Sequence, residues 1–195
     1  MRYNTYIRLE AMCKKIKGYV GTKELLEEGF SNRQIAVLTE EGYLKKICHG
    51  FYWINGSGYE KPIDYKCIEV CLSDPKAVIC MDSALYYQGA IETEPECLSV
   101  STKRTDRSLI NLNFPVNRHY FSENNFEIGL KKKKTEFGCY YIYDIERSVC
   151  DIKRFESGNI EEVITGICSN EYQYKRLLEY AKLLRIKGVC RGMAL

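Results

Sequence analysis

Apolar residues recur at helical spacing near the start of the chain. The positions i, i+3, i+4 and i+7 of this stripe are held by Leu9, Met12, Cys13 and Ile16. Such spacing predicts an amphipathic helix over residues 4–17, with one face covering a small core.

A short helix is predicted next, over residues 23–28. Thr22 is expected to cap its N-terminus, because a hydroxyl oxygen can accept a hydrogen bond from the free N–H groups of the first turn. Gly29 is expected to end the helix in a left-handed conformation, which glycine adopts without steric cost.

A second short helix begins at a well-marked position. Ser31 and Gln34 match the S-x-x-Q capping box, in which each side chain satisfies a backbone N–H of the other residue. Ile35 and Leu38 lie one turn apart and are expected to face the core, and Gly42 is expected to close the helix.

Two strand patterns follow, at residues 43–47 and 51–53, with residues 48–50 as the turn between them. Three helices followed by such a hairpin predict a winged helix-turn-helix, a module that typically binds DNA. In this prediction the first turn of the second short helix enters the major groove, with Arg33 or Gln34 on base edges, and the hairpin contacts phosphates. The residues expected to contact DNA are Thr22, Ser31, Asn32, Arg33, Gln34, Lys45, Lys46, His49 and Gly50.

The overall charge gives this prediction only weak support. The chain has 29 Lys and Arg residues against 26 Asp and Glu residues, a net charge of +3. Glu40 and Glu41 would repel phosphates that came near the C-terminal end of the recognition helix. An inert docking domain with the same helical pattern is therefore an open alternative.

A Gly/Ser-rich break at residues 55–58, closely followed by Pro62, predicts a domain boundary. With 195 residues the chain is long enough for a winged helix-turn-helix over residues 1–58 and a larger domain over residues 59–195.

The second domain is predicted to contain helices, then strands, then helices. Its first helix carries an apolar stripe of Ile63, Cys67, Val70 and Cys71, and a later helix is capped by Asp82 or Ser83 and ends near Gly89. Residues 77–80 form a short apolar run after a turn at Asp74 and Pro75. Strands are expected at residues 97–101, 109–114, 118–121, 126–130 and 139–143, and further helices at 145–155, 160–168 and 172–186. This order predicts an α+β fold, in which a C-terminal mixed α/β domain has a mainly antiparallel sheet.

No run of 18 apolar residues and no hydrophobic signal region occur, which predicts a cytoplasmic protein without a membrane partner. The ten cysteines lie largely in apolar segments, among them Cys13, Cys67, Cys71, Cys80 and Cys150, where reduced core thiols are expected. There is no C-x-x-C motif, and the chain has only two histidines, so no metal site and no cofactor are expected.

Catalytic motifs for nucleotide, acyl or metal-assisted chemistry are absent from the sequence, so an enzyme is not expected. Asp144, Glu146 and Asp151 lie around one helix start, where they could be imagined as metal ligands, but Asp144 is better placed as an N-cap. The positive charge of the second domain forms a possible binding surface for DNA, RNA or an acidic protein, or else a solvated face. Its members are Lys103, Arg104, Arg107, Lys131, Lys132, Lys133, Lys134, Lys175, Arg176, Lys182 and Arg185.

Three segments together resemble a known family. They are GYVGTKELLEEGFSNRQIAVLTEEGYLKKICHGFYWI, AVICMDSALYYQGAI and YYIYDIERSVCDIKRF, in this order and with this spacing. The chain resembles, over nearly its whole length, the AbiEi antitoxins of type IV toxin–antitoxin systems, which act in abortive infection, a form of phage defence.

The resemblance implies a transcriptional repressor that binds inverted repeats of double-stranded promoter DNA in its own operon, as a monomer or a dimer. It also implies protection from a nucleotidyltransferase-like toxin, with which the antitoxin need not form a stable complex. Related sequences often place a basic or aromatic residue where this chain has Ala36 and Val37, so base readout would rest on fewer contacts. An ordinary winged-helix repressor with a ligand-sensing C-terminal domain, and an enzyme that uses its N-terminal domain for targeting, are the alternatives.

Overall fold

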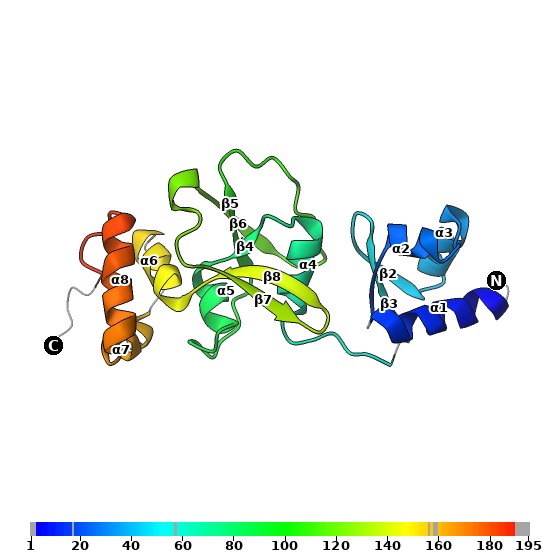
Figure 1. Cartoon of the computed structure of the whole chain (residues 1–195), viewed down its shortest axis with the longest axis horizontal. Helices are drawn as coiled ribbons and strands as arrows, with labels where there is room; N and C mark the ends of the chain where they lie inside the picture. The colour runs from blue at the N-terminus through cyan, green and yellow to red at the C-terminus, as the bar shows by residue number, and fades with distance from the viewer. Residues whose placement is uncertain (1–2, 17, 57, 156, 158–159, 190–195) are drawn as a thin grey trace. The chain divides into compact units, whose positions relative to one another are not determined.

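A computed structural model describes residues 3–16, 18–56, 58–155, 157 and 160–189. Lys17 in the first predicted helix and Ser57 in the predicted boundary lie outside these residues. Figure 1 shows the ribbon of the chain with its helices and strands labelled. The chain divides into two compact units. The first unit comprises Met1–Pro75, Leu109–Asn113 and Lys134–Cys139, and the second comprises Lys76–Ser108, Phe114–Lys133 and Tyr140–Leu195.

The N-terminal part of the first unit is a winged helix-turn-helix, which confirms the fold prediction. Its elements are α1 (Tyr3–Ile16), β1 (Tyr19–Gly21), α2 (Thr22–Glu27), α3 (Asn32–Glu40), β2 (Leu44–Cys48) and β3 (Phe51–Ile54). The strands form an antiparallel sheet in the order β1-β3-β2. The core beneath them includes Leu25 and Leu38, both fully buried, together with the stripe of α1.

Strand β1 was not anticipated from the sequence. It has three residues, all buried, so it shows no alternation of polar and apolar side chains. It forms because Tyr19 pairs in register with Trp53 of β3.

The predicted cap of α2 is wrong by one residue. The N-cap is Gly21, whose N–H donates to the carboxylate of Glu24 at 2.7 Å, and Thr22 is already inside the helix. The predicted end is confirmed, since Gly29 has φ +80° directly after α2. Arg8 of α1 donates to the carbonyl of Glu28 there, which joins α1 to the turn between α2 and α3.

The first unit also contains α4 (Tyr65–Ser73), whose buried face includes Cys67, Ile68 and Val70. The prediction that Ile63 belongs to this apolar stripe is wrong, because its side chain is 89% exposed and lies before the helix. Glu69 is buried on α4, where it accepts hydrogen bonds from the hydroxyl of Tyr19 at 3.1 Å and from the ammonium of Lys61.

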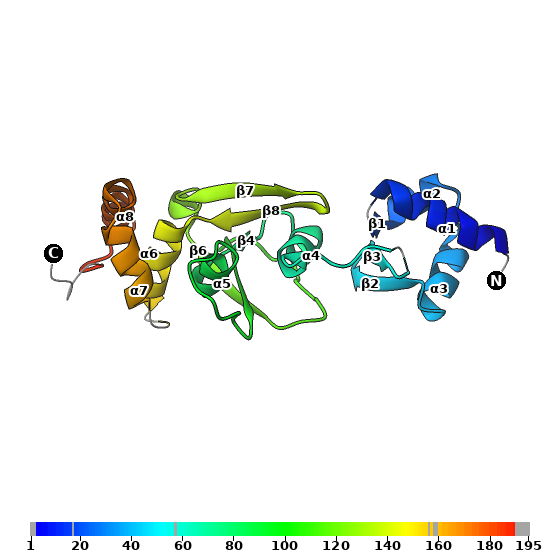
Figure 2. The ribbon, with the colours of Figure 1, turned by 90° about the horizontal axis from the view of Figure 1, so that it is seen from below.

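The remaining elements form a sheet and four helices among the described residues. They are β4 (Val78–Ile79), α5 (Met81–Tyr86), β5 (Leu98–Lys103), β6 (Val116–Phe121), the 3-10 turn η1 (Glu123–Asn125), β7 (Leu130–Thr135), β8 (Gly138–Tyr143), α6 (Ile145–Phe155), α7 (Glu161–Cys168) and α8 (Glu171–Leu183). Helix α6 packs against α5, α7 and α8, and Figure 2 shows α6, α7 and α8 side by side. Buried residues of these helices and of the sheet form one core.

The sheet has the strand order β6-β5-β4-β8-β7. The α+β class is confirmed, but the expectation of a mainly antiparallel sheet needs correction, because the sheet is mixed. Strands β4 and β8 are parallel and so are β5 and β6, whereas β4 and β5 are antiparallel.

Two predicted strands are absent from the described residues. Residues 109–114 belong to the connection between the parallel strands β5 and β6, which must return along the sheet and has no partner strand there. Residues 126–129 form a turn that includes Gly129 at φ +74°, and Leu130 is the first residue of β7. In that region the carbonyls of Asn125 and Ile128 accept hydrogen bonds from the Arg147 guanidinium, so they take no part in a strand ladder.

Capping of α5 also differs from the prediction. Neither Asp82 nor Ser83 is the N-cap, which is Cys80. The Ser83 hydroxyl instead accepts a hydrogen bond from the N–H of Ser99 at 2.9 Å, which attaches α5 to the start of β5. The predicted end near Gly89 is confirmed by its φ of +73°.

The cysteines singled out in the sequence are largely interior. Cys13, Cys67, Cys80 and Cys150 are buried and Cys71 is half-buried. Burial raises the pKa of the Cys80 thiol well above its usual value, because a thiolate would be poorly solvated there. In the part of the chain that the structure describes, no helix is both long and apolar enough to cross a membrane.

Candidate nucleic-acid interface

The N-terminal turn of α3 is one exposed part of the predicted DNA-binding surface. Ser31, Asn32 and Arg33 are exposed, while Ile35 and Leu38 fix the other side of the helix in the core. The capping box is confirmed: the N–H of Gln34 donates to the Ser31 hydroxyl at 3.3 Å, and the N–H of Ser31 donates to the Gln34 amide oxygen at 2.8 Å. The helix therefore starts at a defined point.

The capping box also separates the roles of Arg33 and Gln34. The amide oxygen of Gln34 accepts hydrogen bonds from both the N–H and the hydroxyl of Ser31, at 2.8 and 3.1 Å. That oxygen is therefore occupied in holding the helix start. Arg33, whose side chain is exposed and carries paired donors, is the better candidate for a base edge.

The wing is an edge hairpin with a basic outer strand. Lys45 and Lys46 are both exposed on β2, the edge strand of the small sheet, and His49 is exposed in the turn. The register shifts between Lys46 and Cys48, so that Lys46 pairs with Tyr52 and Cys48 with Phe51. Ile47, which follows them, is buried, whereas both lysines are exposed.

Thr22 joins the wing to α2. Its N–H donates to the carbonyl of Gly50 at 2.7 Å, and its hydroxyl donates to the same oxygen at 3.2 Å. Gly50 itself has φ +79°, a conformation that disfavours other residues. The structure thus gives Thr22 and Gly50, which the sequence placed among the DNA contacts, a role in fixing the wing tip.

The acidic residues of α3 lie at the opposite end of the helix from Arg33. Glu40 and Glu41 are exposed at the C-terminal end of α3, a helix of nine residues. Nine residues span about 13 Å along a helix axis, beyond the screening length of roughly 8 Å at physiological ionic strength. Phosphates near Arg33 would accordingly feel little repulsion from these carboxylates.

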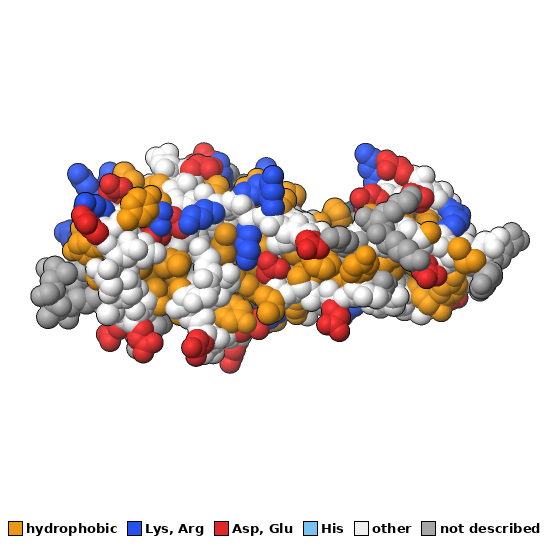
Figure 3. Space-filling model, turned by 60° about the horizontal axis from the view of Figure 1, so that its bottom comes forward, with side chains coloured by type: hydrophobic (Ala, Val, Ile, Leu, Met, Phe, Trp, Pro, Cys, Tyr) orange, Lys and Arg blue, Asp and Glu red, His pale blue; other side chains and the backbone are white. Residues whose placement is uncertain are grey.

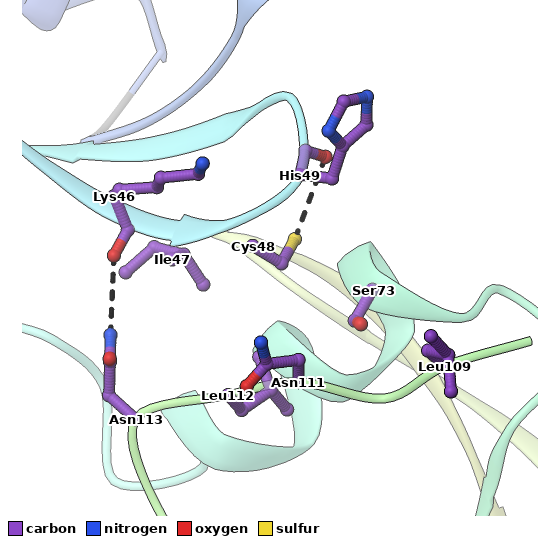
Figure 4. Close-up of a pocket in the computed structure, with 9 residues that line it drawn as sticks. All are labelled: Lys46, Ile47, Cys48, His49, Ser73, Leu109, Asn111, Leu112 and Asn113. Atoms are coloured by element: carbon purple, nitrogen blue, oxygen red, sulfur yellow. Dashed lines mark hydrogen bonds between the residues drawn. The ribbon is translucent and has the colours of Figure 1, made fainter.

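A cavity of about 450 Å³ lies beneath the wing, inside the first unit. Its lining, drawn in Figure 4, consists of Lys46, Ile47, Cys48, His49, Ser73, Leu109, Asn111, Leu112 and Asn113. The Asn113 amide donates to the carbonyl of Lys46 at 3.2 Å, which holds residues 109–113 alongside β2. Sequence reasoning missed this feature because it assigned residues 109–114 to a strand.

The four-lysine run of the second domain lies on β7, an edge strand of the larger sheet. Lys131, Lys132, Lys133 and Lys134 are all exposed; the ammonium of Lys132 lies 5.5 Å from the Tyr141 ring centroid and that of Lys133 lies 5.6 Å from that of Tyr140. Charged edge strands resist pairing with strands of other molecules. This position gives the lysine run a structural explanation that needs no ligand.

The other basic residues of the second unit differ from one another in their surroundings. Arg104 and Arg107 are exposed after β5, and the Lys103 ammonium lies 5.6 Å from the Phe126 ring centroid. In the view of Figure 3, Lys and Arg side chains lie mainly along the upper border with some acidic side chains among them, and further acidic side chains lie along the lower border.

Helix α8 confirms the predicted buried stripe of Leu177, Ala181 and Leu184. Its cations differ in their surroundings. Arg176 donates to Glu146 and is mostly covered, whereas Lys182 is exposed. Lys175 is exposed and paired with Glu171 at 2.6 Å, and Arg185 is exposed just after the helix.

The carboxylates at the start of α6 have structural partners. Asp144 accepts a hydrogen bond from the N–H of Arg147 at 3.0 Å, which confirms its predicted role as the cap of α6. Asp151 forms a fully buried ion pair with Arg147, in which the guanidinium Nε lies 2.8 Å from the carboxylate. Burial raises the pKa of Asp144, and it raises that of Asp151 to about 6. Within the described residues, no group of three acidic, cysteine or histidine side chains could hold a metal ion.

No protein-family model matches the chain, and no curated protein matches it. A solved structure shares its fold. The crystal structure of the RV2827C protein from Mycobacterium tuberculosis aligns with a TM-score of 0.65, over 93% of this chain and 76% of that chain. The two sequences are 13% identical, so the likeness establishes a shared fold that spans both units.

Proposed function

We propose that the chain is an AbiEi-like antitoxin that also represses transcription of its own operon. In this proposal the winged helix-turn-helix binds inverted repeats in the promoter, and the second unit counteracts a nucleotidyltransferase-like toxin encoded next to it. The chain performs no catalysis of its own in this role.

The exposed first turn of α3 beside a basic wing is the observation that carries the DNA-binding part. Arg33 supplies paired donors for a base edge, Lys45 and Lys46 supply positive charge for phosphates, and His49 supplies a ring N–H donor. Arg8 and Thr22 attach α1 and the wing tip to α2, so the two contact surfaces are held on one rigid module.

The packing of the second unit supports the assignment to the family. The two later segments of the resemblance form β4 with α5 and β8 with α6. Although they are far apart in the sequence, β4 pairs with β8 and α5 packs against α6. The resembling residues of these two segments therefore lie together in one core of the second unit.

Bacterial growth tests the antitoxin role. The gene immediately downstream would be induced alone, with the full chain, and with the full-length Arg33→Ala variant. We expect growth to fail in the first case and to recover in the other two, because neutralisation is assigned to the second unit. Absence of rescue by the full chain, or a harmless neighbouring gene, would leave a plain winged-helix repressor.

A promoter–reporter fusion in the same cells tests the repressor role. Arg33→Ala is expected to lose repression while it keeps the rescue of growth. Lys153→Ala, which removes one exposed positive charge from α6 of the second unit, is the matched control and should repress as the native chain does. Full repression by Arg33→Ala would contradict the assignment of α3 as the recognition helix.

A further inference from the structure

We infer that the second unit carries a site for single-stranded nucleic acid, formed by the exposed ring of Tyr120 and the basic loop after β5. This site is separate from the winged helix-turn-helix and does not depend on the proposed repressor role. Tyr120 lies on β6, an edge strand of the larger sheet, and is 50% exposed. A base can stack on an exposed aromatic ring while basic side chains beside it contact the phosphates.

The ring of Tyr120 is held in place by Arg118. The two side chains lie on the same face of β6, because they are two residues apart, and the Arg118 guanidinium lies 5.1 Å from the Tyr120 ring centroid. The same guanidinium donates through Nε to the buried hydroxyl of Thr102 at 2.8 Å, and it forms an ion pair with Asp106 at 3.4 Å. Arg118 therefore supports the ring, and half of the tyrosine stays accessible to a base.

The loop after β5 is fixed beside this ring. Arg118 donates to the carbonyl of Ser108, and Asp106 accepts hydrogen bonds from the N–H and the hydroxyl of Ser108 at 2.8 and 2.7 Å. At the start of the loop, the N–H of Arg104 donates to the carbonyl of Phe121, the residue after the exposed tyrosine, at 3.1 Å. Because these bonds already order the loop, a ligand does not have to order it on binding.

The exposed charge of this loop is positive on balance. Arg104 and Arg107 are exposed, and neither guanidinium has a partner among the described residues. Asp106, in contrast, is largely covered and paired with Arg118. Glu123 is an exposed carboxylate at this loop, where it accepts a hydrogen bond from a threonine hydroxyl at 3.3 Å. The two arginines therefore offer the paired donors that phosphate oxygens accept.

A second exposed tyrosine of the same unit provides a matched control. Tyr172 on α8 is 70% exposed, and the Arg176 guanidinium lies 5.1 Å from its ring centroid. Arg176, however, donates to Glu146. Lys175 pairs with Glu171 at 2.6 Å. Carboxylates thus already occupy these cations, so the ring of Tyr172 has no free cation beside it to attract a phosphate.

Fluorescence anisotropy of the full chain with short labelled oligouridylate and oligothymidylate tests the site. We expect saturable binding of at least one probe, which Tyr120→Ala weakens by about tenfold through loss of one stacked base. Tyr120→Phe, which keeps the ring, and the control Tyr172→Ala should retain the native affinity. Arg104→Ala and Arg107→Ala should each lower the salt slope by about 0.7 units, the effect of losing one phosphate contact on a single strand.

Further comparisons separate this site from the winged helix-turn-helix. Arg33→Ala should bind both probes as the native chain does, and unlabelled duplex DNA should compete poorly, because its paired bases are not free to stack. The inference would be overturned by the absence of binding to both probes, by equal losses in Tyr120→Ala and Tyr172→Ala, by an equal loss in Arg33→Ala, or by full competition from duplex DNA. Operator binding is measured on duplex DNA, so these outcomes leave the test of the repressor role unaffected.

Discussion

Replacement of Arg147 by methionine is expected to destabilise the second unit severely. The side chain is fully buried on α6, with its guanidinium over the rings of Phe121 and Tyr143 at 5.2 and 4.3 Å. It pairs with Asp151 and donates through Nη1 to two backbone carbonyls in the turn before β7, at 2.6 and 2.8 Å. Methionine has similar length and makes none of these polar contacts.

The expected loss of unfolding free energy follows from the buried groups that the substitution leaves without their partner. Breaking a buried ion pair by removing one partner costs roughly 3–5 kcal/mol, since the other charge stays buried. Each carbonyl left without a donor adds about 1–3 kcal/mol unless water reaches it. Relaxation makes these effects less than additive, so we expect a loss of at least about 3 kcal/mol, a large share of the roughly 5–15 kcal/mol that stabilises a typical domain.

Urea unfolding of Arg147→Met and of the native chain measures this loss. Arg154→Met is the matched control, because Arg154 is exposed on the same helix; its change should stay within about 0.5 kcal/mol. The loss should also depend on pH. Burial raises the pKa of Asp151 to about 6 even beside Arg147, whose positive charge lowers it, so the variant raises it further.

The direction of this pH effect follows from proton linkage. A carboxyl group with a raised pKa in the folded state binds protons more readily when folded, so stability falls as pH rises through that pKa. The deficit of Arg147→Met should therefore be smaller at pH 5 than at pH 8. A loss as small as that of Arg154→Met, or a deficit that does not change with pH, would refute this account of the buried pair.

Four further predictions concern the interface and the fold. Arg33→Ala should weaken operator binding by roughly 1–3 kcal/mol and relax sequence preference, whereas Lys45→Ala should weaken binding to all DNA sequences alike and lower the salt slope by about one unit. DNA titrations at several salt concentrations measure both effects. Equal losses for Arg33→Ala on operator and random DNA would contradict base readout. Footprinting should show paired half-sites in inverted orientation, since one winged helix offers a small binding area, and protection of a single half-site would count against this. Ser31→Ala should lower unfolding stability by about 0.5–2 kcal/mol through loss of the cap, while Ser31→Asn, which retains a capping oxygen, should restore most of it. His119→Phe should reduce the loss of stability between pH 7 and pH 5.5: burial lowers the pKa of His119, so protonation opposes folding as pH falls, and parallel pH profiles for the variant and the native chain would refute this.

Local signals in the sequence were sufficient to predict much of the secondary structure of the first unit. The Ser31–Gln34 capping box and the spacing of Ile35 and Leu38 depend on residues within one or two helical turns, and the structure confirms both. The same holds for the bounds of α6, which the sequence predicted at residues 145–155. Strong helical periodicity and caps are encoded by near neighbours, and they remain readable without the fold.

Tertiary contacts decided the features that the sequence missed. β1 exists because β3 pairs with it, and residues 109–113 lie beneath the wing because parallel strands need a returning connection. The turn before β7 depends on Arg147, whose guanidinium donates hydrogen bonds to two of its carbonyl groups. In the candidate interface, the sequence determined which residues are basic or polar. The fold decided that Thr22 fixes the wing tip and that the lysine run occupies a sheet edge, because each of these roles depends on a partner distant along the chain.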